Sequence, residues 1–241
     1  MLSGDEVAAF RKRGFILAKS PLGDAMLAEL HAAVKARPVI RAMRSIGGSG
    51  HQFEMTKRHR AFAELAIDAQ IIAAFRSLLG DDLELHHCKL AVKPLGPGGG
   101  VDWHQDFAFA PHTNEDLVSA FVYLDQTVEA NGAMVMIEGS HHYGPLSHRD
   151  DSGRFVGTCR PPAGDALLVE AQAGQVSFHH SLTVHSSGAQ TTDRPRRGVV
   201  LWVRAADARQ VGGTAFAETG TTLAGQPARD ARCTFSAVEL P

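Results

Sequence analysis

The part of the chain between residues 83 and 205 constrains the fold most, because it consists of short apolar or alternating runs separated by turns. Such runs are typical of β-strands. No helix of useful length interrupts them, so a parallel sheet with helical crossovers is disfavoured and an antiparallel barrel or double-sheet jelly roll is predicted. The predicted strands are 83–93, 117–124, 133–138, 166–170, 175–180 and 197–203.

The first 82 residues show helical periodicity instead. Helices are predicted over 5–13, 24–36 and 60–79. A capping-box pattern marks the start of the first helix. A proline follows the end of the second, and a glycine follows the end of the third. The fold class expected is mainly β with N-terminal α-helices, a double-stranded β-helix flanked by helices. We expect one domain over 1–241, with a helical support region over 1–82, a jelly-roll core over 83–205 and a C-terminal tail over 206–241.

Two connecting segments carry specific expectations. The pair Asn131-Gly132 lies between two predicted strands and favours a tight hairpin turn. The glycine-rich stretch 46–50 predicts a mobile loop, and the whole segment 41–59 is a candidate lid over a pocket.

Composition excludes several functional classes. The formal net charge is −2 and the sequence pI is about 6.7, so no broad basic surface is available for a nucleic acid backbone. Acidic residues occupy the N-terminus where a signal peptide needs basic ones, and no stretch reaches membrane-spanning length. We therefore expect a cytoplasmic protein with a small-molecule substrate, acting without nucleic acid or membrane. The sequence leaves its oligomeric state open.

Histidines, not cysteines, are the candidate metal ligands. The three cysteines are far apart and lack the Cys-x-x-Cys spacing of a thiolate site, whereas histidines number 13. The stretch Trp103-His104-Gln105-Asp106 is the most informative, because residues two apart on an extended strand project from the same face. His104 and Asp106 can thus present an imidazole and a carboxylate to one point, and a third ligand must come from a later strand.

Four segments together resemble the phytanoyl-CoA dioxygenase family. They occur in the family's order and are Trp103-His104-Gln105-Asp106, Asn131-Gly132 leading to Glu138-Gly139-Ser140-His141, Val184-His185-Ser186-Ser187-Gly188, and Arg194-Pro195-Arg196-Arg197. The resemblance implies a double-stranded β-helix that uses Fe(II), 2-oxoglutarate and dioxygen.

The resemblance also implies roles for individual residues. His104, Asp106 and His185 would bind iron and form the catalytic centre, with His179 and His180 as rivals for the third position. His180 is expected to lie nearby without binding the metal, and His179 to face outward. Arg196 would bind the distal carboxylate of 2-oxoglutarate with help from the Ser187 hydroxyl, since a guanidinium forms two parallel charge-assisted bonds to a carboxylate.

Several alternatives remain at this point. Arg197 is the alternative anchor, because adjacent strand residues face opposite sides and only one of the pair can point inward. The activity implied is hydroxylation of an unactivated C–H bond with release of succinate and carbon dioxide. The competing hypotheses are a zinc-type enzyme of non-oxidative chemistry and a small-molecule-binding barrel without activity.

The substrate is the least constrained feature. Five residues near the proposed metal site are candidate substrate contacts, namely Phe107, Phe109, His112, Tyr123 and Met134. Basic residues of the candidate lid could favour an acidic substrate, although a solvated loop is the simpler interpretation; they are Arg41, Arg44, His51, Lys57 and Arg58. Lys93 is expected to be solvated.

Overall fold

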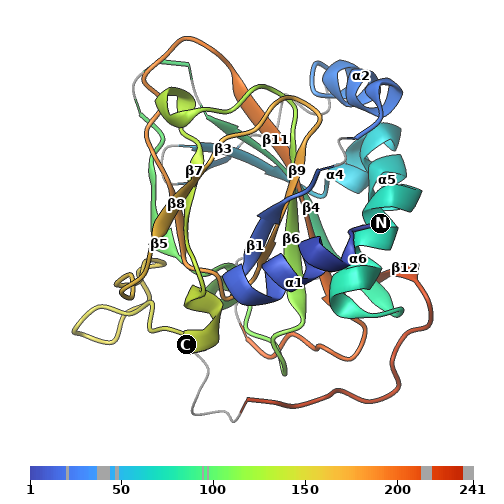
Figure 1. Cartoon of the computed structure of the whole chain (residues 1–241), viewed down its shortest axis with the longest axis vertical. Helices are drawn as coiled ribbons and strands as arrows, with labels where there is room; N and C mark the ends of the chain where they lie inside the picture. Colours follow the sequence, from blue (N-terminus) through green and yellow to red (C-terminus); the bar gives the residue numbers. More distant parts are fainter. Residues whose placement is uncertain are drawn as a thin grey trace.

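The computed structural model describes residues 1–19, 22–36, 44–46, 49–93, 95–96, 98–212 and 219–235. Among these residues the strands form two antiparallel sheets that face each other, with helices stacked on one side (Figure 1). The predicted class, mainly β with N-terminal helices, is confirmed. Within the part of the chain that is described, no helix has the length and apolar character needed to cross a membrane.

The larger sheet holds eight of the described strands. Its order is β1-β9-β6-β11-β4-β3-β2, and β12 pairs with β4 beside this path. The bounds are Phe15–Leu17 for β1, Arg44–Ile46 for β2, Ser49–Phe53 for β3, Leu83–Lys93 for β4, Leu117–Tyr123 for β6, Val176–His180 for β9, Arg196–Ala205 for β11 and Thr221–Ala224 for β12.

The smaller sheet has the order β5-β10-β7-β8. Its strands are β5 (Val101–His104), β7 (Met134–Ile137), β8 (Ala166–Val169) and β10 (His185–Ser187). An apolar cluster fills much of the space between the two sheets, with Phe121 and Val200 from the larger sheet and Met134, Met136 and Val169 from the smaller. The two sheets therefore form the walls of a jelly-roll barrel.

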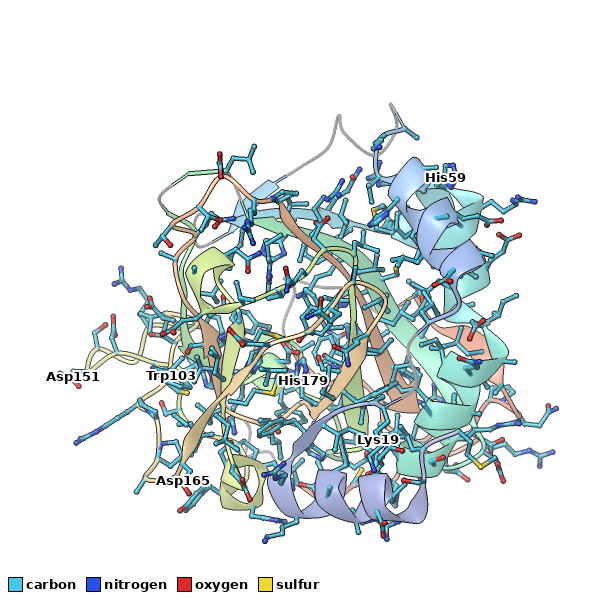
Figure 2. All side chains as sticks on the ribbon, turned by 45° about the horizontal axis from the view of Figure 1, so that its top comes forward. Lys19, His59, Trp103, Asp151, Asp165 and His179 are labelled. Atoms are coloured by element: carbon cyan, nitrogen blue, oxygen red, sulfur yellow. The ribbon has the colours of Figure 1, made fainter. Side chains whose placement is uncertain are left out.

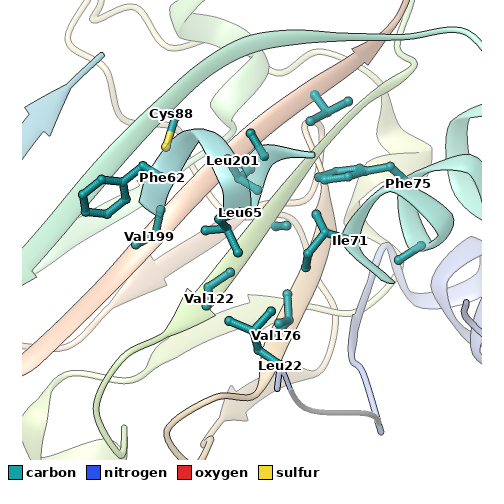
Figure 3. Close-up of a cluster of buried hydrophobic side chains, with 14 of the residues drawn as sticks. Leu22, Phe62, Leu65, Ile71, Phe75, Cys88, Val122, Val176, Val199 and Leu201 are labelled. Atoms are coloured by element: carbon teal, nitrogen blue, oxygen red, sulfur yellow. The ribbon is translucent and has the colours of Figure 1, made fainter. Parts of the chain in front are cut away.

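The helices cover the outer face of the larger sheet (Figure 1). They are α1 (Gly4–Arg13), α2 (Asp24–Ala33), α4 (Met55–Arg58), α5 (Arg60–Ala66) and α6 (Ala69–Leu79). Figure 3 shows Leu65 and Phe75 of these helices packed over Val122, Val199 and Leu201 of the sheet. Side chains alternate between the two faces of a strand. Because one face of β4, β6, β9 and β11 packs under the helices, the side chains of the opposite face point into the barrel.

The capping box predicted for the first helix is present. The Ser3 hydroxyl accepts from the Glu6 amide at 3.2 Å, and the Glu6 carboxylate accepts from the Ser3 amide at 2.9 Å. The helix predicted over 60–79 is wrong as a single helix. It is broken between α5 and α6, because the Asp68 carboxylate accepts from the amides of Gln70 and Ile71 and so starts a new helix. The second helix ends at Ala33, three residues before the predicted end.

All six predicted strands are present, within a few residues of their expected ends. The hairpin predicted at Asn131-Gly132 is wrong, because β6 and β7 belong to different sheets. The Asn131 side chain accepts from the Val128 amide and donates to the Gln126 carbonyl, both at 2.8 Å, and Gly132 takes a φ of 87°. These bonds close the turn that carries the chain from one sheet to the other.

The prediction of a loop over 46–50 also needs correction. Ser49 and Gly50 belong to β3, which pairs along β4 with His51 opposite Ala91 and Phe53 opposite Lys89. Residues 47–48 and 41–43 lie outside the described residues. Within the candidate lid 41–59, β3 is therefore not a lid, because it is paired with β4 and forms part of the barrel wall.

Truncation of a buried helix residue tests the packing in Figure 3. Leu65 is fully buried and Leu95 is 65% exposed. We expect Leu65→Ala to lower the free energy of unfolding by about 2–5 kcal/mol, because it leaves a cavity between α5 and the sheet. Leu95→Ala removes the same atoms from the surface and is expected to change it by less than about 0.5 kcal/mol. Urea denaturation followed by circular dichroism measures both, and equal effects would contradict this packing.

Candidate active site

Two histidines meet because β5 and β10 pair in register. His104 ends β5 and lies directly opposite His185 at the start of β10. Their ring centroids are 4.2 Å apart. Both strands are short and belong to the smaller sheet, and the register shifts between His185 and Ser187. The pairing thus brings together two residues that are 81 positions apart in the sequence.

Asp106 reaches the same point from outside the strand. We expected His104 and Asp106 to alternate along one strand, but β5 ends at His104 and Asp106 begins a 3-10 helix over Asp106–Phe109. Asp106 Oδ1 lies 3.9 Å from His104 Nε2. One ligand atom from each of His104, Asp106 and His185 lies within 4.8 Å of the others, close enough to bind one metal ion. The prediction that these three side chains lie close together is confirmed. The prediction that His104 and Asp106 lie on the same strand is wrong.

The second oxygen of Asp106 is held by two residues of the larger sheet. Ser119 donates its hydroxyl to Asp106 Oδ2 at 2.8 Å, and His179 Nε2 donates to the same oxygen at 3.1 Å. The prediction that His179 faces outward is wrong; it lies near the centre of the molecule in Figure 2, with its ring 4.8 Å from that of His185. His180 faces the opposite way, toward Phe10 and His141. The two hydrogen bonds leave Oδ1 of Asp106 available.

Backbone carbonyls set the tautomer of both facing histidines. His104 Nδ1 lies 2.8 Å from the Asp102 carbonyl oxygen, and His185 Nδ1 lies 2.9 Å from that of Thr183. A carbonyl oxygen only accepts, so each Nδ1 carries the proton and each Nε2 keeps its lone pair. Two Nε2 lone pairs and a carboxylate oxygen are a donor set that suits a divalent transition metal.

The protonation states agree with metal binding. Burial lowers the pKa of His104 and holds the pKa of His185 well below its usual value. Burial favours the neutral form of Asp106, but the hydrogen bond from His179 and nearby positive charge outweigh it and hold the pKa of this carboxyl well below its usual range. At neutral pH the site therefore offers neutral imidazoles and an ionised carboxylate, as metal ligation requires.

Of the paired arginines, Arg196 faces the barrel interior. It is 5% exposed, and its guanidinium carbon lies 4.8 Å from the centre of the Phe121 ring. Gly198 permits this arrangement, because a Cβ there would meet the Phe121 ring at about 2.0 Å. Arg197 faces the other way and forms two bonds to the Asp125 carboxylate, at 2.8 and 2.7 Å. Arg196 Nε is buried and has no hydrogen-bond partner among the described residues.

Lys93 was expected to be solvated and is instead 1% exposed. It lies opposite Arg196 in the β4–β11 pairing and donates to the carbonyl of Gly99. Burial, and then the charge of Arg196, lower the pKa of Lys93 to about 7. Arg196, together with Lys93 when it is protonated, forms a site in the barrel that favours an anion.

Two cavities adjoin the triad. The smaller, of about 90 Å³, is lined by His104, Asp106 and His185 and by Ser187, Arg196, Phe121 and Met134. The larger, of about 310 Å³, extends from His104 and Asp106 to Phe109 and Val156. His51 and Lys89 line both.

The predicted substrate contacts divide between these cavities and the core. Phe109 lines the larger cavity and Met134 the smaller. Phe107, His112 and Tyr123 line neither. Phe107 packs in a separate apolar cluster with Leu117 and Trp202, His112 contacts His86 and Trp202, and the Tyr123 hydroxyl lies 3.1 Å from Ser177 Oγ. These three side chains point into packed parts of the interior.

The site contains residues that the sequence analysis missed, and the alternation of β-strands could have found some of them. In β9, Val176 and Phe178 pack under the helices, so His179 must face the barrel. The same argument applies to Ser119 between Val118 and Ala120. The position of His51 had no such signal, because its segment lacks a strand pattern.

The chain is similar to known proteins in sequence and in fold. The family model for phytanoyl-CoA dioxygenase (PhyH) matches residues 10–198. A curated protein of Stutzerimonas stutzeri, named "Probable alpha-ketoglutarate-dependent hypophosphite dioxygenase", is 36% identical over 156 residues, which cover 61% of this chain and 54% of that protein. This chain thus matches about half the length of that relative. The ectoine dioxygenase of Streptomyces avermitilis is 25% identical over 237 residues, covering 83% of this chain and 78% of the relative.

Solved structures show the same fold. The alpha-ketoglutarate-dependent epimerase SnoN from nogalamycin biosynthesis superposes with a TM-score of 0.78 at 23% identity, covering 97% of this chain and 95% of that one. EctD from S. alaskensis, solved with 2-oxoglutarate and 5-hydroxyectoine, gives a TM-score of 0.73 at 22% identity, covering 94% and 86%. Since the family model spans well over half of its residues, the chain belongs to the phytanoyl-CoA dioxygenase (PhyH) family.

Proposed function

We propose that this protein is a non-haem Fe(II)- and 2-oxoglutarate-dependent dioxygenase that hydroxylates a C–H bond of a small molecule. The observation that carries the proposal is the convergence of His104, Asp106 and His185 with both Nε2 atoms unprotonated. Membership of the PhyH family supports it. The whole chain would act as one domain, since strands from its N-terminal and C-terminal regions join the larger sheet.

In this proposal each group in the barrel has a defined task. His104, Asp106 and His185 hold the iron, and Ser119 and His179 hold Asp106 so that one oxygen remains for the metal. Arg196 binds the distal carboxylate of 2-oxoglutarate with help from Ser187, and the charge of Lys93 adds to that of Arg196. Bound Fe(II) with 2-oxoglutarate supplies activation of dioxygen, with succinate and carbon dioxide as products.

The surrounding residues position the substrate and limit access of water. Phe109 and Val156 form an apolar wall on the larger cavity, next to His104. Met134 and Phe121 form the wall of the smaller cavity. A small molecule would therefore lie beside the metal with its reacting carbon against apolar side chains. A cytoplasmic location remains a prediction.

Formation of the Fe(II)–2-oxoglutarate complex tests the proposal against its two alternatives. Under anaerobic conditions, addition of both to the protein is expected to produce a weak visible absorption band, because 2-oxoglutarate chelates the iron. His104→Ala removes a ligand and should abolish the band, whereas His142→Ala, at an exposed histidine, should keep it. Tight zinc binding without any band would favour the non-oxidative enzyme, and binding of neither metal would favour the inactive barrel.

The two arginines provide a matched test of cosubstrate binding. Arg196→Ala is expected to raise the dissociation constant for 2-oxoglutarate by about 30-fold or more, because loss of one partner of a buried charge pair costs about 2 kcal/mol or more. Arg197→Ala should change it by less than about threefold, since its guanidinium binds Asp125. Titration of the visible band measures both constants. The opposite ranking would assign the anchor to Arg197.

The hydrogen bonds to Asp106 predict an effect on metal affinity. Ser119→Ala removes a donor to Oδ2 and is expected to weaken metal binding by about 10–100-fold, as loss of such supporting contacts typically does. Ser177→Ala is the control, because this equally buried serine bonds to Tyr123 instead. Anaerobic titration with Co(II) gives the affinities. Equal affinities for the two variants would show that Ser119 does not support the metal site.

A further inference from the structure

Gln105 lies between His104 and Asp106 and is fully buried, yet it lines neither of the two cavities. Its side-chain NH2 group donates to the Leu182 carbonyl at 2.8 Å. Leu182 lies in the turn that leads to His185 at the start of β10. Gln105 therefore joins the segment that carries two of the proposed metal ligands to the turn that leads to the third.

The backbone of Gln105 is held by His148, which is also fully buried. The Gln105 amide donates to His148 Nε2 at 2.9 Å. His148 Nδ1 lies 2.8 Å from the Leu146 carbonyl oxygen, so Nδ1 carries the proton and Nε2 has the lone pair that accepts. The Leu146 amide in turn donates to the Gln105 side-chain oxygen at 2.8 Å. These three residues form a closed set of hydrogen bonds around the peptide bond that follows His104.

Aromatic side chains fix the position of the His148 ring. It lies nearly parallel to the Phe155 ring, with centroids 6.4 Å apart and 21° between the planes, and the centroid of the Phe109 ring is 6.5 Å away. Phe109 also contacts the His104 ring, at 5.7 Å, and lines the larger cavity. His148 thus contacts both the backbone of the proposed metal site and the wall of the larger cavity.

The chain that leaves His148 is fastened by its own backbone. The Val156 amide donates to the His148 carbonyl at 2.9 Å, and the Cys159 amide donates to the Trp103 carbonyl at 2.8 Å. Residues 156–158, between these two bonds, line the larger cavity. A change in the His148 side chain removes neither bond, so this segment can keep its fold when the side chain is replaced.

From these contacts we infer that His148 is a positioning residue for the metal site, whose Nε2 holds the backbone between His104 and Asp106 so that both side chains reach one metal ion. Gln105 extends this effect to the turn before His185. The inference rests on the proposed oxygenase function and adds a residue that acts on the metal through its ligands. Without the acceptor, the buried Gln105 amide would lose its partner, which is costly, and the backbone would move to relieve the loss.

Three substitutions of His148 test the role of Nε2. In His148→Gln the side-chain oxygen can take the place of Nε2, whereas the side chain of His148→Asn is one carbon shorter and cannot reach the Gln105 amide. Both lose the ring, so the difference between them isolates the acceptor. His148→Phe keeps a ring against Phe109 and Phe155 but has no acceptor, and it replaces His148→Asn if the shorter side chain prevents folding. Circular dichroism shows which variants are folded.

Anaerobic titration of the full chain with Co(II) measures metal affinity, and the visible Co(II) spectrum reports the ligand geometry. His148→Asn and His148→Phe are expected to bind Co(II) about 10–100-fold more weakly, with an altered spectrum, as loss of supporting contacts near a metal typically causes. His148→Gln should stay within about threefold of the wild type, because the amide keeps an acceptor. Phe155→Leu is the packing control and should also keep its affinity, since it removes a neighbour of the ring and leaves Nε2 in place.

Each other outcome contradicts a defined statement. Absence of Co(II) binding in the folded wild type would contradict the proposed function itself. Wild-type affinity in folded His148→Asn or His148→Phe would overturn the role of His148. A loss in His148→Gln as large as that in His148→Asn, or an equal loss in Phe155→Leu, would assign the effect to packing of the ring and would overturn the role of Nε2.

Discussion

The pairing of β5 with β10 is the constraint on which the site depends. It places His104 opposite His185, and the carbonyls of Asp102 and Thr183 then orient both rings through their Nδ1 atoms. A one-residue slip in this register would turn one histidine to the other face of the sheet. The proposed metal site therefore depends on the smaller sheet for its two histidines, and Asp106 joins them from the 3-10 helix that follows β5.

The larger sheet has an apolar face that forms the core with the helices and a face with polar residues that lines the candidate site. Its outer face is apolar and packs under α5 and α6, whereas the inner face carries Ser119, His179 and Arg196. Removing polar side chains from water is costly unless they are paired. Ser119 and His179 are paired with Asp106. The buried Arg196, whose Nε has no hydrogen-bond partner among the described residues, would be fully paired only with an anion. The core and the site are therefore built from the same strands.

Much of this arrangement could be predicted from the sequence. The strands between 83 and 205 have strong alternation, and the three residues predicted as metal ligands, His104, Asp106 and His185, do lie together. The errors concern tertiary context. Asp68 could end one helix and start another because its carboxylate caps amides locally, and Asn131 closes a turn between sheets that looks like a hairpin in sequence. The pairing of β3 with β4, which brings His51 to the cavity, depends on contacts that no local pattern encodes.

X-ray absorption spectroscopy of the Fe(II)-loaded protein tests the central claim most directly. Three protein ligands should leave positions open on the metal. The spectrum is expected to contain two imidazoles in a site of five or six ligands and to change when 2-oxoglutarate is added, as its two oxygens replace water. A four-coordinate site that does not respond to 2-oxoglutarate would contradict the assignment of His104, Asp106 and His185 as an open metal centre for an oxygenase.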